Sequence, residues 1–297
     1  MQWLEVSVST SFEAQEAVSE IVRRAGSQGV VLEDGPSGVV VTAYFPVTTG
    51  DETIDRIRRG VAALPAVGLD PSPATIAARW VADEDWAESW KKYFHTTWIT
   101  ERIVVVPAWE EVPRALGRHR ERHVVGDIIP IVLEPGMAFG TGTHASTALA
   151  LKLIEACLVP GDDAIDVGTG TGILAVALAK LGARSVRAVD VDPLAVRVAE
   201  ANIAQNRPPV PIDVRRADLL TGETEPATLI VANILPEVHE RLVPLALPLL
   251  LPGGRIILSG IIDAEVPRMR ALIERHGFAA IRTLSEDGWT ALCARRP

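Results

Sequence analysis

The chain has 297 residues, of which 48% are hydrophobic and 23% charged, and its formal net charge at pH 7 is −9. This composition is sufficient for one or two substantial cores and argues against an intrinsically disordered chain. The negative charge argues against a protein that binds the phosphate backbone of nucleic acids; it suits a basic partner, although solubility alone also explains it.

The first 80 residues predict an α+β domain. Apolar residues alternate with polar ones over Trp3 to Ser9, as in a strand, and recur with helical spacing over residues 12–26. Two further strands, GVVLED and GVVVTAYFP, and a helix at 51–68 follow. This order fits a ferredoxin-like split βαβ arrangement, which needs one more strand near Thr75 to Trp80. Because it carries no catalytic signature, we expect residues 1–80 to recognise a substrate.

Residues 81–125 are expected to form a linker and a tryptophan-rich connecting segment. Trp86, Trp90 and Phe94 recur every four residues and would share one face of a short helix. That face is either an interdomain core or a binding surface. The basic cluster at residues 114–127 contains no aromatic residues, so we expect a solvated loop there and not a nucleic-acid patch.

Residues 126–297 are expected to form one domain, which from about Gly161 alternates strands and helices as an open, Rossmann-like α/β sheet does. Its last two strands are joined by Asp287-Gly288, a hairpin turn that makes them antiparallel. Pro244 and Pro248 should kink or split the helix that contains them.

The remaining composition signals are negative. Cys157 and Cys293 are far apart in the sequence and lack His or Cys neighbours at metal-ligand spacing, so we expect buried thiols, no disulfide framework and no metal site. The N-terminus, MQWLEVSVST, does not have the pattern of a signal peptide, and no apolar run approaches about 20 residues. We therefore expect a cytoplasmic protein that does not bind membranes.

The tetrapeptide GTGT occurs twice, in EPGMAFGTGTHAST at 134–147 and in DVGTGTGIL at 166–174. The downstream copy lies between the first strand of the sheet and its first helix, where doubly wound folds bind nucleotides. The spacing of Gly168, Gly170 and Gly172 does not match the dinucleotide fingerprint, and neither copy continues into the lysine of a P-loop. The two segments therefore indicate a nucleoside ligand without a phosphate.

Three acidic residues lie near the downstream copy. Asp190 ends the second strand 22 positions after Gly168, close to the spacing of about 20 at which a carboxylate binds ribose hydroxyls. Asp192 is the competing candidate, and its alternative role is to cap the next helix. Asp166 either bonds to the loop backbone, approaches a cationic ligand group or serves as a turn residue. A phosphate-free glycine loop, a ribose carboxylate and a terminal hairpin together resemble the class I methyltransferases that use S-adenosylmethionine.

Asn233, in VANILP, follows an apolar strand and should stand at the same edge of the sheet. A methyltransferase holds its methyl acceptor at this edge, and an amide oxygen can accept a hydrogen bond from an amine and orient it. Asn also commonly ends a strand and starts a turn. We favour the functional interpretation because the residue lies in the catalytic half.

A closer resemblance rests on several motifs together. EPGMAFGTGTHAST, DVGTGTGIL, AVDVDPLAV, ANILPE and GWTALCARR, preceded by WAESWKKYF and IVVVPAW, resemble the bacterial methyltransferase family that modifies ribosomal protein L11. The resemblance runs from about Trp86 to the end of the chain. The glycine loop is common to many methyltransferases, whereas GMAFGTGTH is specific to very few families.

The resemblance implies a protein methyltransferase that trimethylates the N-terminal α-amine and lysine side chains of ribosomal protein L11. It also implies that the N-terminal domain grips this substrate and that a linker lets the domain swing. The cofactor-binding residues that it implies are Thr147, Gly168, Asp190 and Asn233, and from the glycine segments we add Gly142, Gly170 and Asp166. Asn233 is also the predicted amine-positioning residue, and Met137, Phe139 and His144 either line the acceptor channel or pack.

The chain departs from the family pattern at a few positions. Thr169 and Thr171 stand where the family commonly has cysteine and serine, and Ala145 stands where it has proline; these exchanges of small residues should preserve cofactor binding. Pro236, close behind the asparagine, bears on the mouth of the acceptor site.

Three alternative functions remain. A nucleic-acid amino methyltransferase usually has an aromatic residue directly after this asparagine, where this chain has Ile234. A small-molecule methyltransferase would leave the N-terminal domain unexplained. A non-enzymatic ribosome-associated factor would bind the cofactor, or keep the fold, without transferring methyl groups.

Overall fold

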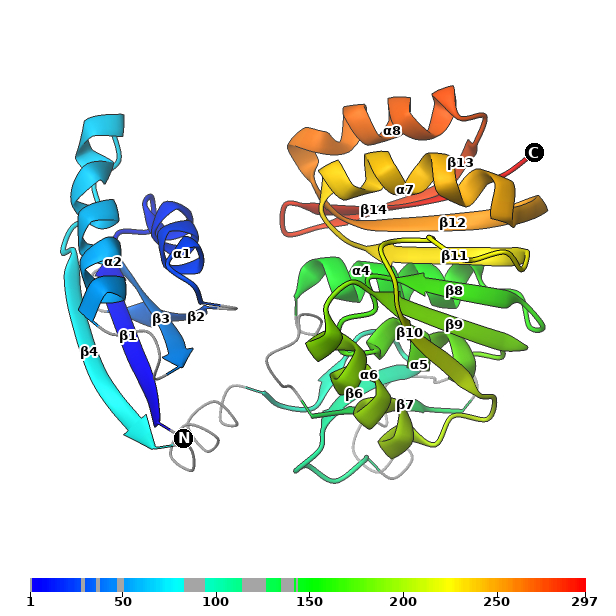
Figure 1. Ribbon diagram of the computed structural model, residues 1–297, viewed down its shortest axis with the longest axis horizontal. Coiled ribbons are helices and arrows are strands. Elements are labelled where there is room, and N and C mark those ends of the chain that lie inside the picture. Colours follow the sequence, from blue (N-terminus) through cyan, green and yellow to red (C-terminus); the bar gives the residue numbers. More distant parts are fainter. Residues whose placement is uncertain are drawn as a thin grey trace. The chain divides into compact units, whose positions relative to one another are not determined.

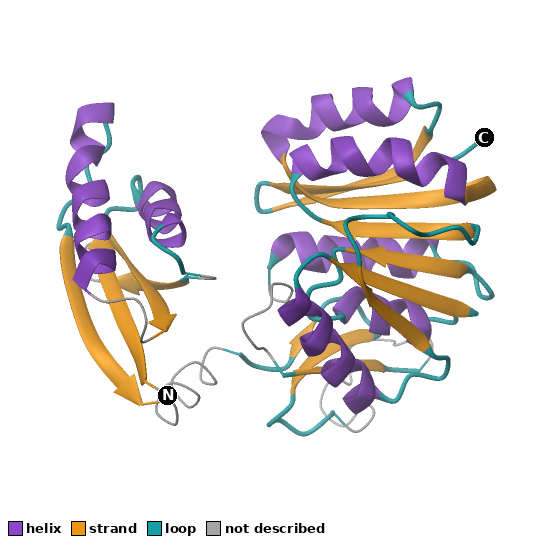
Figure 2. Ribbon diagram, viewed as in Figure 1, coloured by secondary structure: helices purple, strands orange, loops and turns teal. Residues whose placement is uncertain are grey.

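The computed structural model describes residues 2–27, 30–35, 38–46, 51–82, 94–113, 127–134, 142 and 144–297. The chain forms two compact units, Met1–Phe94 and His95–Pro297, which Figures 1 and 2 draw by chain position and by secondary structure. The expected helix that carries Trp86 and Trp90 lies outside the described residues.

The first unit contains one four-stranded antiparallel sheet in the order β2-β3-β1-β4. The additional strand expected near residues 75–80 is present as β4. Along β1, Val6 and Val8 are fully buried while Ser7 is only half-buried, which is the alternation that the sequence predicted. The elements are β1 Gln2–Thr10, α1 Gln15–Arg24, β2 Val31–Gly35, β3 Gly38–Pro46, α2 Asp51–Ala63, the 3-10 turn Leu64–Val67 and β4 Thr75–Ala82.

The second unit contains a seven-stranded sheet in the order β10-β9-β8-β11-β12-β14-β13. Neighbouring strands are parallel except where β14 pairs antiparallel with β12 and β13. Asp287 and Gly288 both have positive φ angles, 50° and 77°, as the hairpin between β13 and β14 requires. The predicted Rossmann-like sheet with a terminal hairpin is thereby confirmed. Its strands are β8 Asp163–Val167, β9 Ser185–Asp190, β10 Ile212–Arg216, β11 Ala227–Asn233, β12 Leu250–Ile262, β13 Ala279–Glu286 and β14 Trp289–Arg295.

Helices cover both faces of this sheet (Figure 1). One face packs against α4 Ala145–Cys157, α5 Ile173–Lys180 and α6 Pro193–Asn206, and the other against α7 Pro236–Leu249 and α8 Val266–Arg275, which the 3-10 turn Asp263–Glu265 precedes. Within β11, Leu229 and Val231 face the first group while Ile230 and Ala232 face the second. Pro244 and Pro248 both lie within α7, so of the two expected outcomes, a kink or a split, the structure excludes the split.

A small three-stranded sheet, which the sequence did not predict, completes the second unit. Its strands are β5 Thr97–Trp98, β6 Ile103–Pro107 and β7 Ile129–Leu133, with β6 and β7 parallel. The apolar runs IVVV and IPIVL form its buried part and pack with α5 and α6. Part of the expected connecting segment therefore belongs to the core of the second unit.

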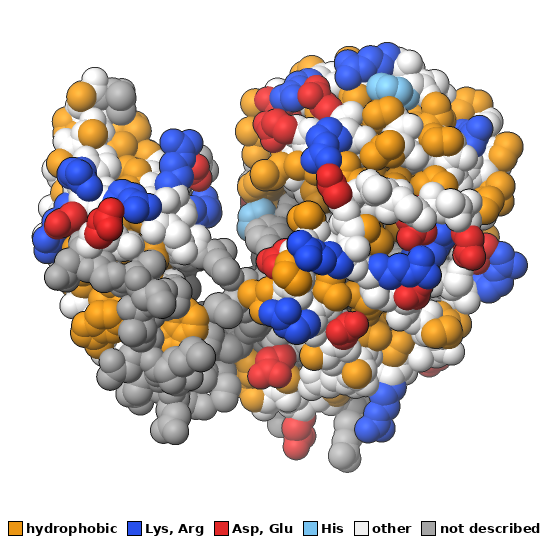
Figure 3. Space-filling model, viewed as in Figure 1, with side chains coloured by type: hydrophobic (Ala, Val, Ile, Leu, Met, Phe, Trp, Pro, Cys, Tyr) orange, Lys and Arg blue, Asp and Glu red, His pale blue; other side chains and the backbone are white. Residues whose placement is uncertain are grey.

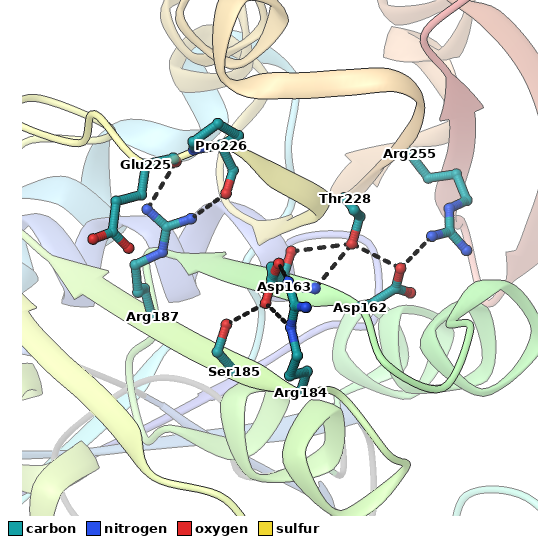
Figure 4. A network of polar contacts seen from close by, with 9 residues as sticks. All are labelled: Asp162, Asp163, Arg184, Ser185, Arg187, Glu225, Pro226, Thr228 and Arg255. Atoms are coloured by element: carbon teal, nitrogen blue, oxygen red, sulfur yellow. Dashed lines mark hydrogen bonds and ion pairs between the residues drawn. The ribbon is translucent and has the colours of Figure 1, made fainter.

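A polar network joins the amino ends of the central strands (Figure 4). Thr228 Oγ1 donates to Asp162 Oδ1 over 2.7 Å and accepts from the backbone N–H of Asp163 over 2.9 Å. Arg255 donates to the same Asp162 oxygen over 2.5 Å. Arg184 pairs with Asp163 and holds the pKa of that carboxyl below its usual value. These contacts fasten one edge of the sheet, and the carboxyl ends of the strands form the opposite edge.

The cysteines are both free thiols. Cys293 is buried, as expected, whereas Cys157 is only half-buried. Within the described ranges, no group of three or more His, Cys, Asp or Glu side chains could hold a metal ion. No helix of these ranges is both long and apolar enough to cross a membrane.

Candidate active site

The downstream glycine segment forms the turn between β8 and α5. Its glycines all adopt left-handed backbone angles, with φ of 73° at Gly168, 55° at Gly170 and 82° at Gly172, a conformation that side chains disfavour. The N–H groups of Gly168 and Thr169 donate to the carbonyl oxygen of Val189, over 2.9 and 3.0 Å. The turn is therefore fastened to β9.

Asp166, in β8, stabilises this turn through hydrogen bonds. Its side chain is fully buried, and Oδ2 accepts hydrogen bonds from Thr169 Oγ1 over 2.7 Å and from the N–H of Ala175 over 3.1 Å. Burial raises the pKa of Asp166 to about 7, and the neighbouring Asp190 carboxylate adds to this effect. Oδ1 has no hydrogen-bond partner among the described residues. Asp166 thus bonds to a side chain of the loop and to the backbone of α5, and not to the loop backbone, and Oδ1 stays available as an acceptor.

Asp190 and Asp192 have different roles. Asp190 Oδ2 accepts from the N–H of Gly170 over 2.9 Å, and Oδ1 accepts from the N–H of Asp192 over 3.0 Å. Each carboxylate oxygen retains lone-pair capacity for a ligand hydroxyl. Asp192 caps α6 by accepting from the N–H of Leu194 over 2.8 Å. Of the two candidates, Asp190 is therefore the one that contacts the glycine loop.

Asn233 ends β11 at the carboxyl edge and lies beside the first turn of α4. Its Nδ2 donates to Oγ1 of the fully buried Thr147 over 3.2 Å. Its Oδ1 is buried and has no partner among the described residues. A buried acceptor without a partner costs about 1–3 kcal/mol, which a ligand donor would recover. Thr147 therefore orients the Asn233 carboxamide, whose oxygen is available to a ligand donor.

Close packing joins Asn233 to the glycine loop. A Cβ atom added to Gly168 would lie 2.5 Å from Cγ2 of Ile234, the residue after Asn233. Beyond it, Leu235 is 65% exposed, and Pro236 begins α7 in a buried position. The proline therefore serves as the first residue of that helix.

The upstream glycine segment is described at Glu134, at Gly142 and from His144 onward; Met137 and Phe139 lie outside the described residues. Gly142 has a φ angle of 85°, and a Cβ there would lie 2.9 Å from Val105 and 3.1 Å from Ile173. Because Ile173 begins α5 directly after the downstream turn, the end of the upstream segment packs beside that turn.

His144 combines helix capping with packing. Its side chain accepts from the N–H of Ser146 at the start of α4, over 3.3 Å. Its ring meets Trp289 edge to face, with centroids 4.8 Å apart and planes at 70°. These contacts support the packing alternative for this residue.

Ser259, which the sequence analysis missed, lies beside Asn233 in the strand register. Its carbonyl oxygen accepts from the N–H of Ile234 over 3.3 Å and contacts Nε2 of His239 at 2.8 Å, and its Oγ donates to the carbonyl of Ser146 over 2.7 Å. Both side chains are fully buried, and burial lowers the pKa of His239 to about 4. Ser259 therefore links the end of β11 to α4 and α7. A polar Ser-Gly pair directly after the apolar run IIL was the available signal.

Comparison with known proteins gives a consistent result. The sequence model of the family described as ribosomal protein L11 methyltransferase (PrmA) matches residues 2–297. Ribosomal protein L11 methyltransferases of Bacillus cytotoxicus and Bacillus cereus are 38% and 37% identical to this chain over 319 aligned positions, which cover 99% of each protein.

A solved structure supports the same grouping. The crystal structure of a ribosomal protein L11 methylase from Lactobacillus delbrueckii subsp. bulgaricus superposes with a TM-score of 0.62 at 33% identity. The match covers 69% of this chain and 100% of that one. The chain belongs to the ribosomal protein L11 methyltransferase (PrmA) family.

Proposed function

We propose that this chain is an enzyme that transfers methyl groups from S-adenosylmethionine to amines of ribosomal protein L11. The observation that carries the proposal is the Asn233–Thr147 pair, which presents a buried amide oxygen without a partner beside the glycine loop. The names and near-complete coverage of the relatives support the choice of substrate.

The donor set fits a nucleoside cofactor with a cationic end. The free Oδ1 of Asp166 and the remaining lone pairs of Asp190 are acceptors, as ribose hydroxyls and an ammonium group require. When bound, S-adenosylmethionine supplies an electrophilic methyl group. We assign its binding to the predicted set Gly142, Thr147, Asp166, Gly168, Gly170, Asp190 and Asn233.

Asn233 positions the attacking amine. For a primary or secondary amine, its Oδ1 accepts one N–H and thereby directs the nitrogen lone pair, while Thr147 keeps the carboxamide from rotating. Only the neutral amine can attack. At pH 7 an α-amino group of ordinary pKa, about 7.7–8.0, is neutral in roughly a tenth of molecules, and a lysine of pKa about 10.4 in roughly one in 2500. An amide is a poor base, so the amine proton leaves to water, and Asn233 contributes orientation.

The two units have separate roles in this proposal. We assign substrate recognition to residues 1–80, connection to residues 81–125 and methyl transfer to residues 126–297. The strand order β2-β3-β1-β4 supports a ferredoxin-like recognition domain. The substrate sites are the N-terminal α-amine and lysine side chains, and we place the reaction in the cytoplasm. A net charge of −9 suits a basic ribosomal protein.

The surface of the second unit does not favour a nucleic-acid substrate. On the face seen in Figure 3, basic and acidic side chains are interspersed. Several of the arginines in this unit pair with carboxylates, among them Arg268 with Glu240 and Glu265, and Arg241 with Asp218. Paired arginines are less available to phosphates.

The test is incubation with labelled S-adenosylmethionine and three acceptors: purified ribosomal protein L11, ribosomal RNA and an extract of small metabolites. The proposal expects label on the protein alone, mapped by mass spectrometry to the N-terminal and lysine nitrogens. Label only on RNA or a metabolite would identify one of the alternative methyltransferases. Cofactor binding without transfer to any acceptor would identify a non-enzymatic factor.

A further inference from the structure

Two asparagines of α6 are buried despite their polar side chains: Asn202 is 1% exposed and Asn206 is 8% exposed. They are four residues apart and so lie on one face of the helix, which packs against β7 and α5. Buried amides require hydrogen-bond partners. The two side chains have different partners, and of the two only Asn202 bonds to the glycine loop.

Asn202 bridges the two glycine-rich segments. Its Nδ2 donates to the carbonyl oxygen of Thr171, in the downstream GTGT, over 2.9 Å. Its Oδ1 accepts from the N–H of Glu134, the first residue of EPGMAFGTGTHAST, over 3.0 Å. One buried carboxamide therefore fixes the start of the upstream segment relative to the cofactor loop.

Further contacts converge on the same part of the loop. A Cβ at Gly172 would lie 3.2 Å from Cα of Ala199, one turn before Asn202, so α6 approaches the turn closely. Farther along, the upstream segment approaches the loop again where Gly142 packs beside Ile173. Residues 171–173 thus lie against α6 and against the upstream segment at Gly142, and Asn202 extends the connection to Glu134.

Asn206 bonds to β7, the strand that ends just before Glu134, and not to the downstream glycine loop. Its Oδ1 accepts from the N–H of Val132 and from Lys180 Nζ, each over 2.9 Å, and its Nδ2 donates to the carbonyls of Val132 and Asn202. Loss of Asn206 would loosen β7, whereas loss of Asn202 would also release Thr171. The chain therefore contains its own matched control.

We propose that Asn202 is a positioning residue for cofactor binding, because it couples the downstream glycine loop to the start of the upstream segment. The inference rests on the proposed function, since it takes the glycine loop as the cofactor site. Asn202 acts through Thr171 and Glu134 and not through the ligand.

The test compares Asn202→Ala, Asn202→Asp and Asn206→Ala in the full-length chain. Affinity for S-adenosylhomocysteine is measured by calorimetry, with KM for S-adenosylmethionine and kcat on ribosomal protein L11, well below each melting temperature. The Asp variant keeps the acceptor for Glu134 and replaces the donor to Thr171 with a carboxyl oxygen, so it tests the Thr171 contact if the Ala variant does not fold. We expect Kd and KM to rise about tenfold or more in both Asn202 variants, as loss of one buried hydrogen bond predicts. The value of kcat should change less than KM.

Asn206→Ala should lower the melting temperature while its Kd stays within about twofold of wild type, since its side chain does not bond to the loop. Equal Kd values in all folded variants, or equal losses at Asn202 and Asn206, would overturn the inference. The outcome is separate from that of the proposed function: if wild type binds the cofactor but does not methylate ribosomal protein L11, the function is wrong and the Kd comparison still decides the role of Asn202.

Discussion

Asn233 and Thr147 are 86 positions apart in the chain, yet Nδ2 of the asparagine donates to Oγ1 of the threonine over 3.2 Å. One residue ends β11 and the other lies in the first turn of α4. Ser259, adjacent to Asn233 in the sheet, also bonds to the carbonyl of Ser146, so α4 is bonded to two neighbouring strands, β11 and β12. The orientation of the Asn233 amide therefore depends on the position of α4.

Removing the Thr147 hydroxyl should impair methyl transfer. Thr147→Val keeps the side-chain shape but leaves Asn233 Nδ2 without its acceptor, so the amide can rotate. We expect the rate at saturating substrates to fall on the order of ten- to a hundredfold. Thr147→Ser retains the acceptor and should stay within about threefold of wild type by the same reasoning. The check is steady-state methylation of ribosomal protein L11, and a fully active Val variant would refute the positioning role.

The elements of this site could be predicted to different degrees. Asp190, Asp166 and Asn233 could be named as candidates from the sequence because each lies at or next to the end of a strand with recognisable apolar patterning. Ser259 was missed because its importance comes from lying beside Asn233 in the sheet, a relationship between distant segments. The sheet formed by β5, β6 and β7 was missed for a similar reason: β6 and β7 pair in space but are separated in the sequence by the basic cluster at residues 114–127.

The prolines of α7 show the limit of local propensity. Pro244 and Pro248 were expected to kink or split this helix, and the structure shows one unsplit helix that contains both. The apolar face of α7, which includes Leu242, Val243 and Ala246, is fully buried against the sheet. Burial of about 1.5–3 kcal/mol for each large side chain offsets a proline cost of about 3 kcal/mol. Local propensity is therefore overridden by packing that a single segment does not reveal.

Asp190 and Asp192 provide a matched pair for cofactor binding. Asp190→Ala removes the carboxylate that holds the N–H of Gly170, and we expect Kd for S-adenosylmethionine to rise on the order of a hundredfold. Asp192→Ala removes only the α6 cap, which should cost about 1 kcal/mol of unfolding free energy and leave Kd within about twofold. Calorimetric titration and urea unfolding measure the two effects. Unchanged affinity in Asp190→Ala would eliminate the ribose assignment.

Asp166 should make stability depend on pH. Its pKa is about 7 in the folded chain against a usual value of 3.8, with burial as the main cause. Between these values the folded state binds more protons than the unfolded state, so the free energy of unfolding should fall as pH rises from about 4 to about 7 and level off above. Below about pH 4, the neutral Asp166 carboxyl makes its full contribution to the free energy of unfolding.

The measurement is urea unfolding of wild type and Asp166→Asn at pH 5, 6, 7 and 8. The variant lacks the titrating group. The unfolding free energy of the variant minus that of wild type should therefore increase with pH up to about pH 7, with a slope of at most about 1.4 kcal/mol per pH unit. Parallel stability curves for the two proteins would show that Asp166 does not titrate in this range.

Gly260 should be required for the normal rate of methyl transfer because it lies close to the side chain of Asn233. Its φ angle is 80°, and an added Cβ would lie 2.5 Å from the carbonyl oxygen of Ile234 and 3.0 Å from Asn233 Oδ1. Gly260→Ala therefore combines backbone strain with displacement of the amide that orients the amine. We expect methylation to fall about tenfold or more, and the free energy of unfolding to fall by about 1–3 kcal/mol.

Gly277→Ala separates these two effects. Gly277 has nearly the same φ angle, 81°, but a Cβ there would meet no atom within 4 Å. This substitution should cost about 1–2 kcal/mol of stability through the backbone alone and leave the methylation rate unchanged. The pair is compared by urea unfolding and by the initial rate on ribosomal protein L11 at saturating cofactor. If both variants lost activity in proportion to stability, the contact with Asn233 would have no part in the rate; loss of rate at Gly260 alone places the orienting function in the Asn233 amide.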